Sequence, residues 1–66
     1  AGALPWLVRA VEAAPDDVEA LAALADARLR AGDVDGARTV LARGLTLAPT
    51  HQRLTALQRQ ASRLLP

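Results

Sequence analysis

The sequence predicts an all-α fold in which four short helices form antiparallel helix–turn–helix repeats, as in a fragment of an α-solenoid. Three observations lead to this prediction. Ala and Leu, both strong helix formers, supply sixteen and twelve of the 66 residues. Gly and Pro divide the chain into four segments of helical length. The beginning of the chain also resembles a later part at a fixed offset, which is typical of repeat architectures.

The internal similarity has an offset of 34 residues. Six positions carry the same residue type in both copies: Gly2, Ala3, Leu7, Arg9, Ala14 and Pro15 in the first, and Gly36, Ala37, Leu41, Arg43, Ala48 and Pro49 in the second. A period of this size indicates a helix pair that stacks on its neighbours and shares a core with them. The chain of 66 residues is therefore expected to form one small domain.

Two prolines bound the first helix. Pro5 fits a first helical turn, where its missing N–H is not needed, and Pro15 cannot continue a helix. We therefore expect a helix at residues 4–14. All the joining segments are only a few residues long, so sequential helices are expected to pack antiparallel.

Acidic residues and glycine delimit the second helix. Either Asp16 or Asp17 can cap its N-terminus. Glu19, three residues after Asp16, would complete a pair that resembles a capping box. Gly32 can adopt the left-handed conformation that ends a helix, so this helix is expected to stop just before it.

The last two helices have comparable signals. Asp33 is expected to cap the third helix, and Pro49 to end it near residue 48. Thr50 is expected to cap the fourth helix, which would run to about Leu64. Gly44 lies inside the third helix, where glycine costs about 1 kcal/mol relative to alanine. Close approach of a neighbouring helix would explain it, and sequence drift at a tolerant site is the alternative.

The pattern of the middle of the chain resembles a tetratricopeptide repeat. The matching positions are Leu21, Leu24, Ala25, Gly32, Asp33, Ala37, Leu41, Gly44 and Pro49. The resemblance implies a complete repeat at residues 16–49, preceded at 1–15 by the second helix of an earlier repeat. Residues 50–66 would then be the first helix of a following repeat or a C-terminal capping helix.

Two departures from the family pattern bear on this division. Arg28 stands where the family usually has an aromatic residue. Leu54 and Leu57 align with the second helix at an offset of 33 rather than 34, and Gln58 falls where a small residue is expected. These departures, with a largely polar helix, favour a capping role for residues 50–66.

The family resemblance implies a non-catalytic protein–protein interaction module whose first helices line a concave groove. Carried over by position, the groove residues would be Glu19, Ala22, Ala23, Asp26, Leu29, Arg30 and Arg53. The family's known use of Lys and Asn there to hold a C-terminal carboxylate is not expected, because the chain contains neither residue type. Asp26 and Arg30 are an i,i+4 pair, so a solvated, salt-bridged surface is the alternative interpretation.

The expected first helix is apolar nearly all round. Its self-association candidates are Leu4, Trp6, Val8 and Val11. One side would cover the second helix, and the other would face a helix absent from this chain or a second subunit, with Trp6 as the anchor. The alternative is that Trp6 folds into the chain's own core.

No residue pattern indicates a catalytic, cofactor-binding or metal site. His51 lacks neighbouring ligands and is expected at the surface in the first turn of the fourth helix. Ser62 lies about 16 Å from it along that helix, too far for a nucleophile–base pair. Nucleic-acid binding is not favoured because the few exposed arginines lack accompanying aromatic residues. No apolar run is long enough to span a membrane.

Charge is distributed unevenly along the chain. Residues 1–33 hold six acids and three Arg, a net charge of −3, and residues 34–66 hold one acid and five Arg, a net charge of +4. This asymmetry could orient a partner or a head-to-tail contact. The overall interpretation is a scaffold module, a terminal part of a larger bacterial protein or a self-associating domain, with a cytoplasmic location favoured over a periplasmic one. The alternatives are an accessory domain appended to an enzyme, and an independent small protein that oligomerises.

Overall fold

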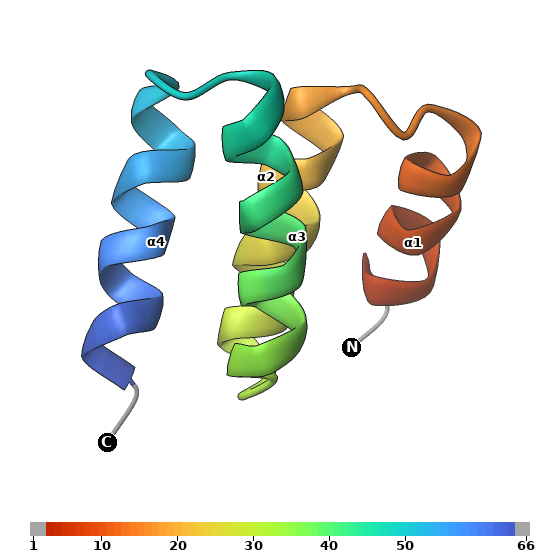
Figure 1. Cartoon of the computed structure of the whole chain (residues 1–66). Coiled ribbons are helices and arrows are strands. Elements are labelled where there is room, and N and C mark those ends of the chain that lie inside the picture. The colour runs from red at the N-terminus through yellow and green to blue at the C-terminus, as the bar shows by residue number, and fades with distance from the viewer. Residues whose placement is uncertain (1–2, 65–66) are drawn as a thin grey trace.

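The fold consists of four antiparallel helices. The computed structural model describes residues 3–64, with side chains described from Pro5 onward. Within these residues the helices are α1 (Ala3–Ala13), α2 (Val18–Arg30), α3 (Val34–Leu47) and α4 (Gln52–Leu64). Each helix runs antiparallel to the one before it, and the turns alternate between the two ends of the molecule (Figure 1). The predicted all-α fold of helix–turn–helix units is confirmed.

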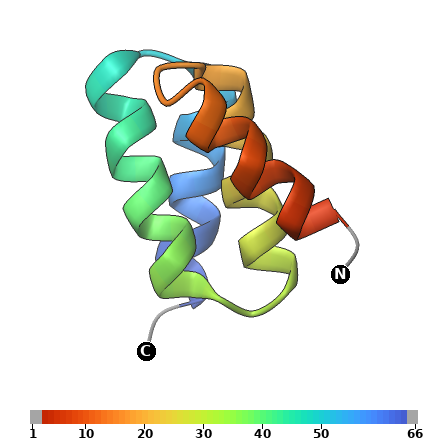
Figure 2. The same cartoon turned by 90° about the vertical axis from the view of Figure 1, so that its right-hand side faces the viewer.

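Helix α2 is central to the arrangement. It packs against α3 most extensively and also contacts α1 and α4. Figure 1 shows α1 and α4 on opposite sides of the α2–α3 pair, and Figure 2 shows the molecule from the α1 side. Within the described residues α1 and α4 do not contact each other. The molecule is therefore an open layer of helices, with extents of 32 × 28 × 15 Å, rather than a closed bundle.

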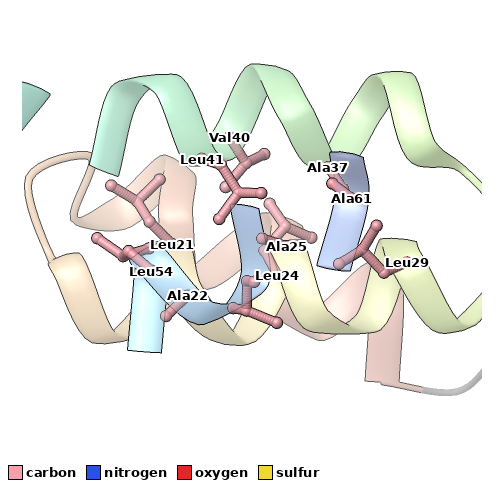
Figure 3. Close-up of a cluster of buried hydrophobic side chains, with 11 residues drawn as sticks. Leu21, Ala22, Leu24, Ala25, Leu29, Ala37, Val40, Leu41, Leu54 and Ala61 are labelled. Atoms are coloured by element: carbon pink, nitrogen blue, oxygen red, sulfur yellow. The ribbon is translucent and has the colours of Figure 1, made fainter. Parts of the chain in front are cut away.

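The hydrophobic core lies where α2, α3 and α4 meet (Figure 3). Its largest fully buried side chains are Leu21, Leu41 and Leu54, one from each of these helices. Burying one such side chain contributes about 1.5–3 kcal/mol. The remaining buried apolar residues are Ala22, Leu24, Ala25, Leu29, Ala37, Val40, Leu57 and Ala61. Four of these eight are alanines, so the helices approach closely around few large side chains.

Both ends of α2 have side-chain or backbone caps. Asp17, not Asp16, is the N-cap: its Oδ1 accepts hydrogen bonds from the N–H groups of Glu19 at 3.1 Å and Ala20 at 3.3 Å. The expected pairing of Asp16 with Glu19 in a capping box is wrong, because the helix begins one residue later than that pairing requires. At the other end Gly32 has φ +86°, the left-handed conformation predicted for it.

The turn between α2 and α3 is tightly built. The N–H of Asp33 donates to the Arg28 carbonyl at 2.8 Å, and the N–H of Gly32 donates to the Leu29 carbonyl at 3.1 Å, which together form a Schellman motif. Asp33 then caps α3 as predicted, accepting from the Gly36 N–H at 2.9 Å. A Cβ at Gly36 would overlap the Asp33 carboxylate, so glycine there makes room for the cap.

Gly44 lies where α3 and α4 come together. A Cβ added there would lie 3.0 Å and 3.1 Å from the two methyl carbons of Leu54. Leu54 is fully buried, so its side chain has little freedom to move away. The close-approach explanation for Gly44 is confirmed.

We predict that Gly32→Ala lowers the free energy of unfolding by about 1–2 kcal/mol, the cost of placing an L side chain in the left-handed conformation. Gly32→Asn should lose less, because Asn visits this conformation more readily. Urea denaturation followed by circular dichroism measures both variants. Equal losses would indicate that space rather than backbone conformation decides the effect, although nothing lies within 4 Å of a Cβ at this position.

We predict that Gly44→Leu lowers the free energy of unfolding by about 1–3 kcal/mol, because it overpacks the contact with Leu54. Gly44→Ala should change it far less, since its gain of about 1 kcal/mol in helix propensity offsets a small shift of the Leu54 methyl groups. Thermal and urea unfolding of the two variants test this difference. A leucine tolerated without loss would show that α3 and α4 separate easily.

Candidate protein-binding surface

The predicted groove residues that are accessible lie along one face of α2 and the start of α4. On α2 they are Glu19, Ala23, Asp26 and Arg30, which recur at helical spacing and therefore share a face. Arg53 lies in the first turn of α4 and reaches the same face. We refer to these five residues as the α2–α4 surface.

A chain of ion pairs crosses this surface from one helix to the other. Arg53 lies between two acids of α2, with Nη1 4.0 Å from Glu19 Oε2 and Nη2 3.8 Å from Asp26 Oδ2. Arg30 Nε donates to the other oxygen of Asp26 at 3.3 Å. The solvated, salt-bridged arrangement expected for Asp26 and Arg30 is therefore present, and it extends to α4. Two acids and two arginines leave the surface with no net charge.

His51 joins this network and starts α4. Its carbonyl accepts from the N–H of Thr55 at 3.0 Å, and its Nδ1 accepts from the N–H of Leu54 at 3.3 Å. Because Nδ1 accepts, the ring proton lies on Nε2, which donates to Glu19 Oε1 at 3.0 Å. The imidazole therefore caps α4 and ties it to the first turn of α2.

The prediction that Thr50 caps α4 is wrong, and His51 takes that place. His51 is also less exposed than expected, because only 24% of its side chain is accessible. Its use as a cap could not be read from the local sequence, since histidine is outside the usual capping residues and Glu19, which orients the ring, is 32 residues away.

Two of the predicted groove residues do not face solvent. Ala22 is fully buried and Leu29 is 6% exposed, and both belong to the core. The physical reason is that α2 packs against α4 as well as α3, so one flank of the expected groove face is covered. The assignment of Ala22 and Leu29 to a ligand-facing surface is therefore corrected.

The self-association candidates on α1 divide into three groups. Trp6 is 70% exposed, so it does not fold into the chain's own core. Val8 and Val11 are partly buried and pack against the core, so they serve the internal fold. Leu4 falls outside the residues whose side chains are described. Of the candidates with described side chains, Trp6 is the one that projects into solvent.

Arg28, which stands where the resemblance places an aromatic residue, spans the turn between α2 and α3. Its Nη1 donates to the carbonyl of Gly36 at 3.5 Å across the turn between α2 and α3. Its guanidinium also lies beside the space that a Cβ at Gly36 would occupy. The arginine and the glycine thus fit together, which the family pattern alone did not indicate.

Neither a metal-site cluster nor a membrane-spanning helix is found in the part of the chain that the structure describes. Residues 3–64 contain no group of three or more His, Asp or Glu side chains placed to hold a metal ion. None of the described helices combines the length and the apolar character needed to cross a membrane. The described ion pairs are side-chain contacts at the surface.

Comparison with known families agrees with this architecture. A family model described as the tetratricopeptide repeat matches residues 1–61. The chain belongs to the tetratricopeptide repeat family. No curated protein and no solved structure matches it. In this tetratricopeptide repeat chain, α2 and α3 form the helix pair that the predicted complete repeat at 16–49 contains, while the repeat boundaries themselves stay a prediction.

The exposed side of α4 is largely polar, although Leu64 at its end is 52% exposed. Gln58, Arg59, Ser62 and Arg63 are all exposed, and the buried residues of the helix are confined to Leu54, Leu57 and Ala61. A polar outer face is what a terminal helix of a repeat array requires. The capping role of residues 50–66 stays a prediction.

We predict that His51→Ala lowers the free energy of unfolding by about 0.5–2 kcal/mol, the usual cost of losing an N-cap. His51→Asn should recover most of this loss, because a short amide can accept from the same N–H while it cannot reach Glu19. Thermal unfolding followed by circular dichroism compares them. If Asn destabilises as much as Ala, the bond to Glu19 outweighs the cap.

Proposed function

We propose that this tetratricopeptide repeat chain is a non-catalytic scaffold module that binds a segment of another protein on the α2–α4 surface. Membership of the family supports a protein partner. The observation that carries the choice of surface is that Glu19, Asp26, Arg30 and Arg53 form one continuous charged face across two helices. The proposal holds for a free-standing module and for one attached to an enzyme.

Ala23 leaves this charged face flat enough for a peptide backbone. It lies between Glu19 and Asp26 on the same side of α2 and is partly exposed. A partner backbone that crosses at Ala23 can place its side chains against the charges on either side. Exposed surface ion pairs contribute about 0–1 kcal/mol each, so a partner can exchange them for its own at little cost.

The charges at the two ends of the surface define the partner's chemistry. Arg30 engages Asp26 through Nε, and 78% of its side chain is exposed, so its outer edge can bind a carboxylate of the partner. The Glu19 side chain is 71% exposed at the opposite end and can accept a basic side chain. These residues are eleven positions apart on α2, which corresponds to about 16 Å along the helix.

This spacing sets the separation of the partner's charged residues. An extended chain advances about 3.3 Å per residue, so about five residues span the same distance. The proposed partner segment is therefore extended and carries a basic and an acidic side chain about five positions apart. It would bind antiparallel or parallel to α2 according to the order of these two residues.

A displayed library of extended peptides, selected on the immobilised chain, tests this proposal. Selected peptides should carry the two opposite charges, and Ala23→Arg should weaken their binding by about tenfold or more, because its side chain blocks the backbone path. Thr46→Arg adds the same side chain at an exposed position on α3 and should leave binding unchanged. Isothermal titration of the selected peptides measures both variants.

Two results would contradict the proposal. Peptides that bind Ala23→Arg and the unaltered chain alike would place the site elsewhere. Peptides that lose affinity for Thr46→Arg instead would move the site to the outer face of α3. Circular dichroism of both variants establishes that each retains its helices, so that lost binding reflects the surface.

A further inference from the structure

The exposed Trp6 occupies a position that is buried one repeat later. The 34-residue offset aligns Trp6 of α1 with Val40 of α3. Val40 is 8% exposed and belongs to the core, whereas Trp6 is 70% exposed. The difference arises because α3 packs on both α2 and α4, while within the described residues α1 packs on α2 alone. The position of Trp6 is thus one that a preceding helix would cover.

The other end of the layer has a cavity between α3 and α4. Its volume is about 470 Å³, and its floor includes Leu41 and Ala61, both 1% exposed. The remaining lining residues are Asp35, Arg38, Thr39, Ala42, Gln58 and Ser62. It lies where a helix following α4 would pack in a continued array.

Four lining residues of this cavity correspond by repeat position to apolar residues of α1 and α2. Leu41 and Ala42 of α3 align at 34 residues with Leu7 and Val8 of α1. Gln58 and Ser62 of α4 align at 33 residues with Ala25 and Leu29 of α2. These four equivalents all belong to the core that contains Val40 or pack against it. The cavity is therefore lined by the repeat equivalents of residues on α1 and α2, the two helices that precede α3.

We propose that a second copy of this chain docks head to tail, so that its α1 packs on α3 and α4 and its Trp6 fills this cavity. In the assembly, α4 of one copy and α1 of the next form a helix pair equivalent to α2 and α3. This inference concerns a surface separate from the α2–α4 surface, so it does not depend on the function proposed above.

A polar contact of α3 supports the same docking. Arg43 Nε donates to the carbonyl of Pro15 at 3.1 Å, which fastens α3 to the turn before α2. The 34-residue offset aligns Arg43 with Arg9 and Pro15 with Pro49. In the head-to-tail contact, Arg9 of the docked copy therefore faces the Pro49 carbonyl in the turn before α4. The chain carries the same donor and the same acceptor position at its two ends.

The chemistry of the cavity suits tryptophan better than valine. Gln58 and Ser62 are polar, whereas their repeat equivalents on α2, Ala25 and Leu29, are buried apolar residues of the core. A buried indole N–H needs an acceptor, which the Gln58 amide and the Ser62 hydroxyl can provide. The overall charges of the two halves are also opposite in sign, with six acids and three Arg in residues 1–33 and one acid and five Arg in residues 34–66, so they favour a head-to-tail orientation at long range.

Sedimentation velocity and tryptophan fluorescence of the chain test this proposal over a concentration series of about 10 μM to 1 mM, the range of weak interfaces. The average mass should rise with concentration. The emission of Trp6, the single tryptophan, should shift to shorter wavelength over the same range as the indole leaves water. A chain that stays monomeric up to the highest concentration would overturn the proposal.

Two blocked variants separate the two halves of the contact. Trp6→Ala removes the inserted side chain, and the double variant Ala42→Glu, Ser62→Glu adds two carboxylates at exposed positions of the cavity. Each should associate about tenfold or more weakly than the unaltered chain. Mixed in equal amounts they should form a 1:1 heterodimer, because each retains the half that the other lacks.

A control variant shows whether the loss of any exposed apolar side chain weakens the association. Leu47→Ala removes another exposed apolar side chain, 43% exposed and outside the cavity, and should associate like the unaltered chain. Self-association of the double variant at undiminished strength would instead indicate a symmetric contact between two α1 helices and would overturn the head-to-tail arrangement. A mixture without heterodimer would overturn it as well. Circular dichroism establishes that each variant is folded.

Discussion

The close approach of α2 to three other helices is the constraint on which the rest of this structure depends. A chain of 66 residues buries only about 60% of the surface that it exposes when unfolded. Each buried leucine therefore contributes a large share of the free energy of unfolding. The chain has no Phe, Tyr, Ile or Met, and alanine and glycine lie where its helices touch. Ala22, Ala25 and Ala37 are fully buried, and Gly44 lets the backbone of α3 approach Leu54 of α4. Dispersion contacts between nearby backbones thus replace those of larger side chains.

This packing decides which residues remain for binding. Because α4 covers one flank of α2, Ala22 and Leu29 turn inward, and the exposed face of α2 narrows to the stripe that contains Glu19, Asp26 and Arg30. Arg53 then connects α4 to this stripe through both acids. The α2–α4 surface is therefore formed by residues of two helices, so its shape depends on how α4 packs against α2. His51 fixes that relation at one end, by capping α4 and bonding to Glu19 at once.

The spacing of apolar residues and the positions of Gly, Pro and Asp were enough to predict the four helices, the turn at Gly32 and the cap at Asp33. They also predicted why glycine stands at position 44. Each of these features depends on residues close in the sequence or on a repeated pattern. Predictions failed where a distant residue decides the outcome. Thr50 is the better capping residue by type, yet His51 caps α4 because Glu19 holds its ring. The inward position of Ala22 depends on how far α4 wraps around α2, which no local pattern encodes. The exposure of Trp6 likewise depends on tertiary packing, because within the described residues α1 contacts α2 alone.

The two ends of the helix layer share a geometry but differ in chemistry, and this difference bears on the proposed head-to-tail contact. Such a contact uses different surfaces on the two partners, so it does not close on itself and can extend into a filament. A cavity lined by an alanine and a leucine, the residues at the equivalent positions of α2, would bind an apolar side chain strongly and would favour unlimited growth. Gln58 and Ser62 instead keep the free cavity hydrated and polar. An inserted indole must replace that water and satisfy its own N–H, which limits the gain from burial and makes the contact reversible.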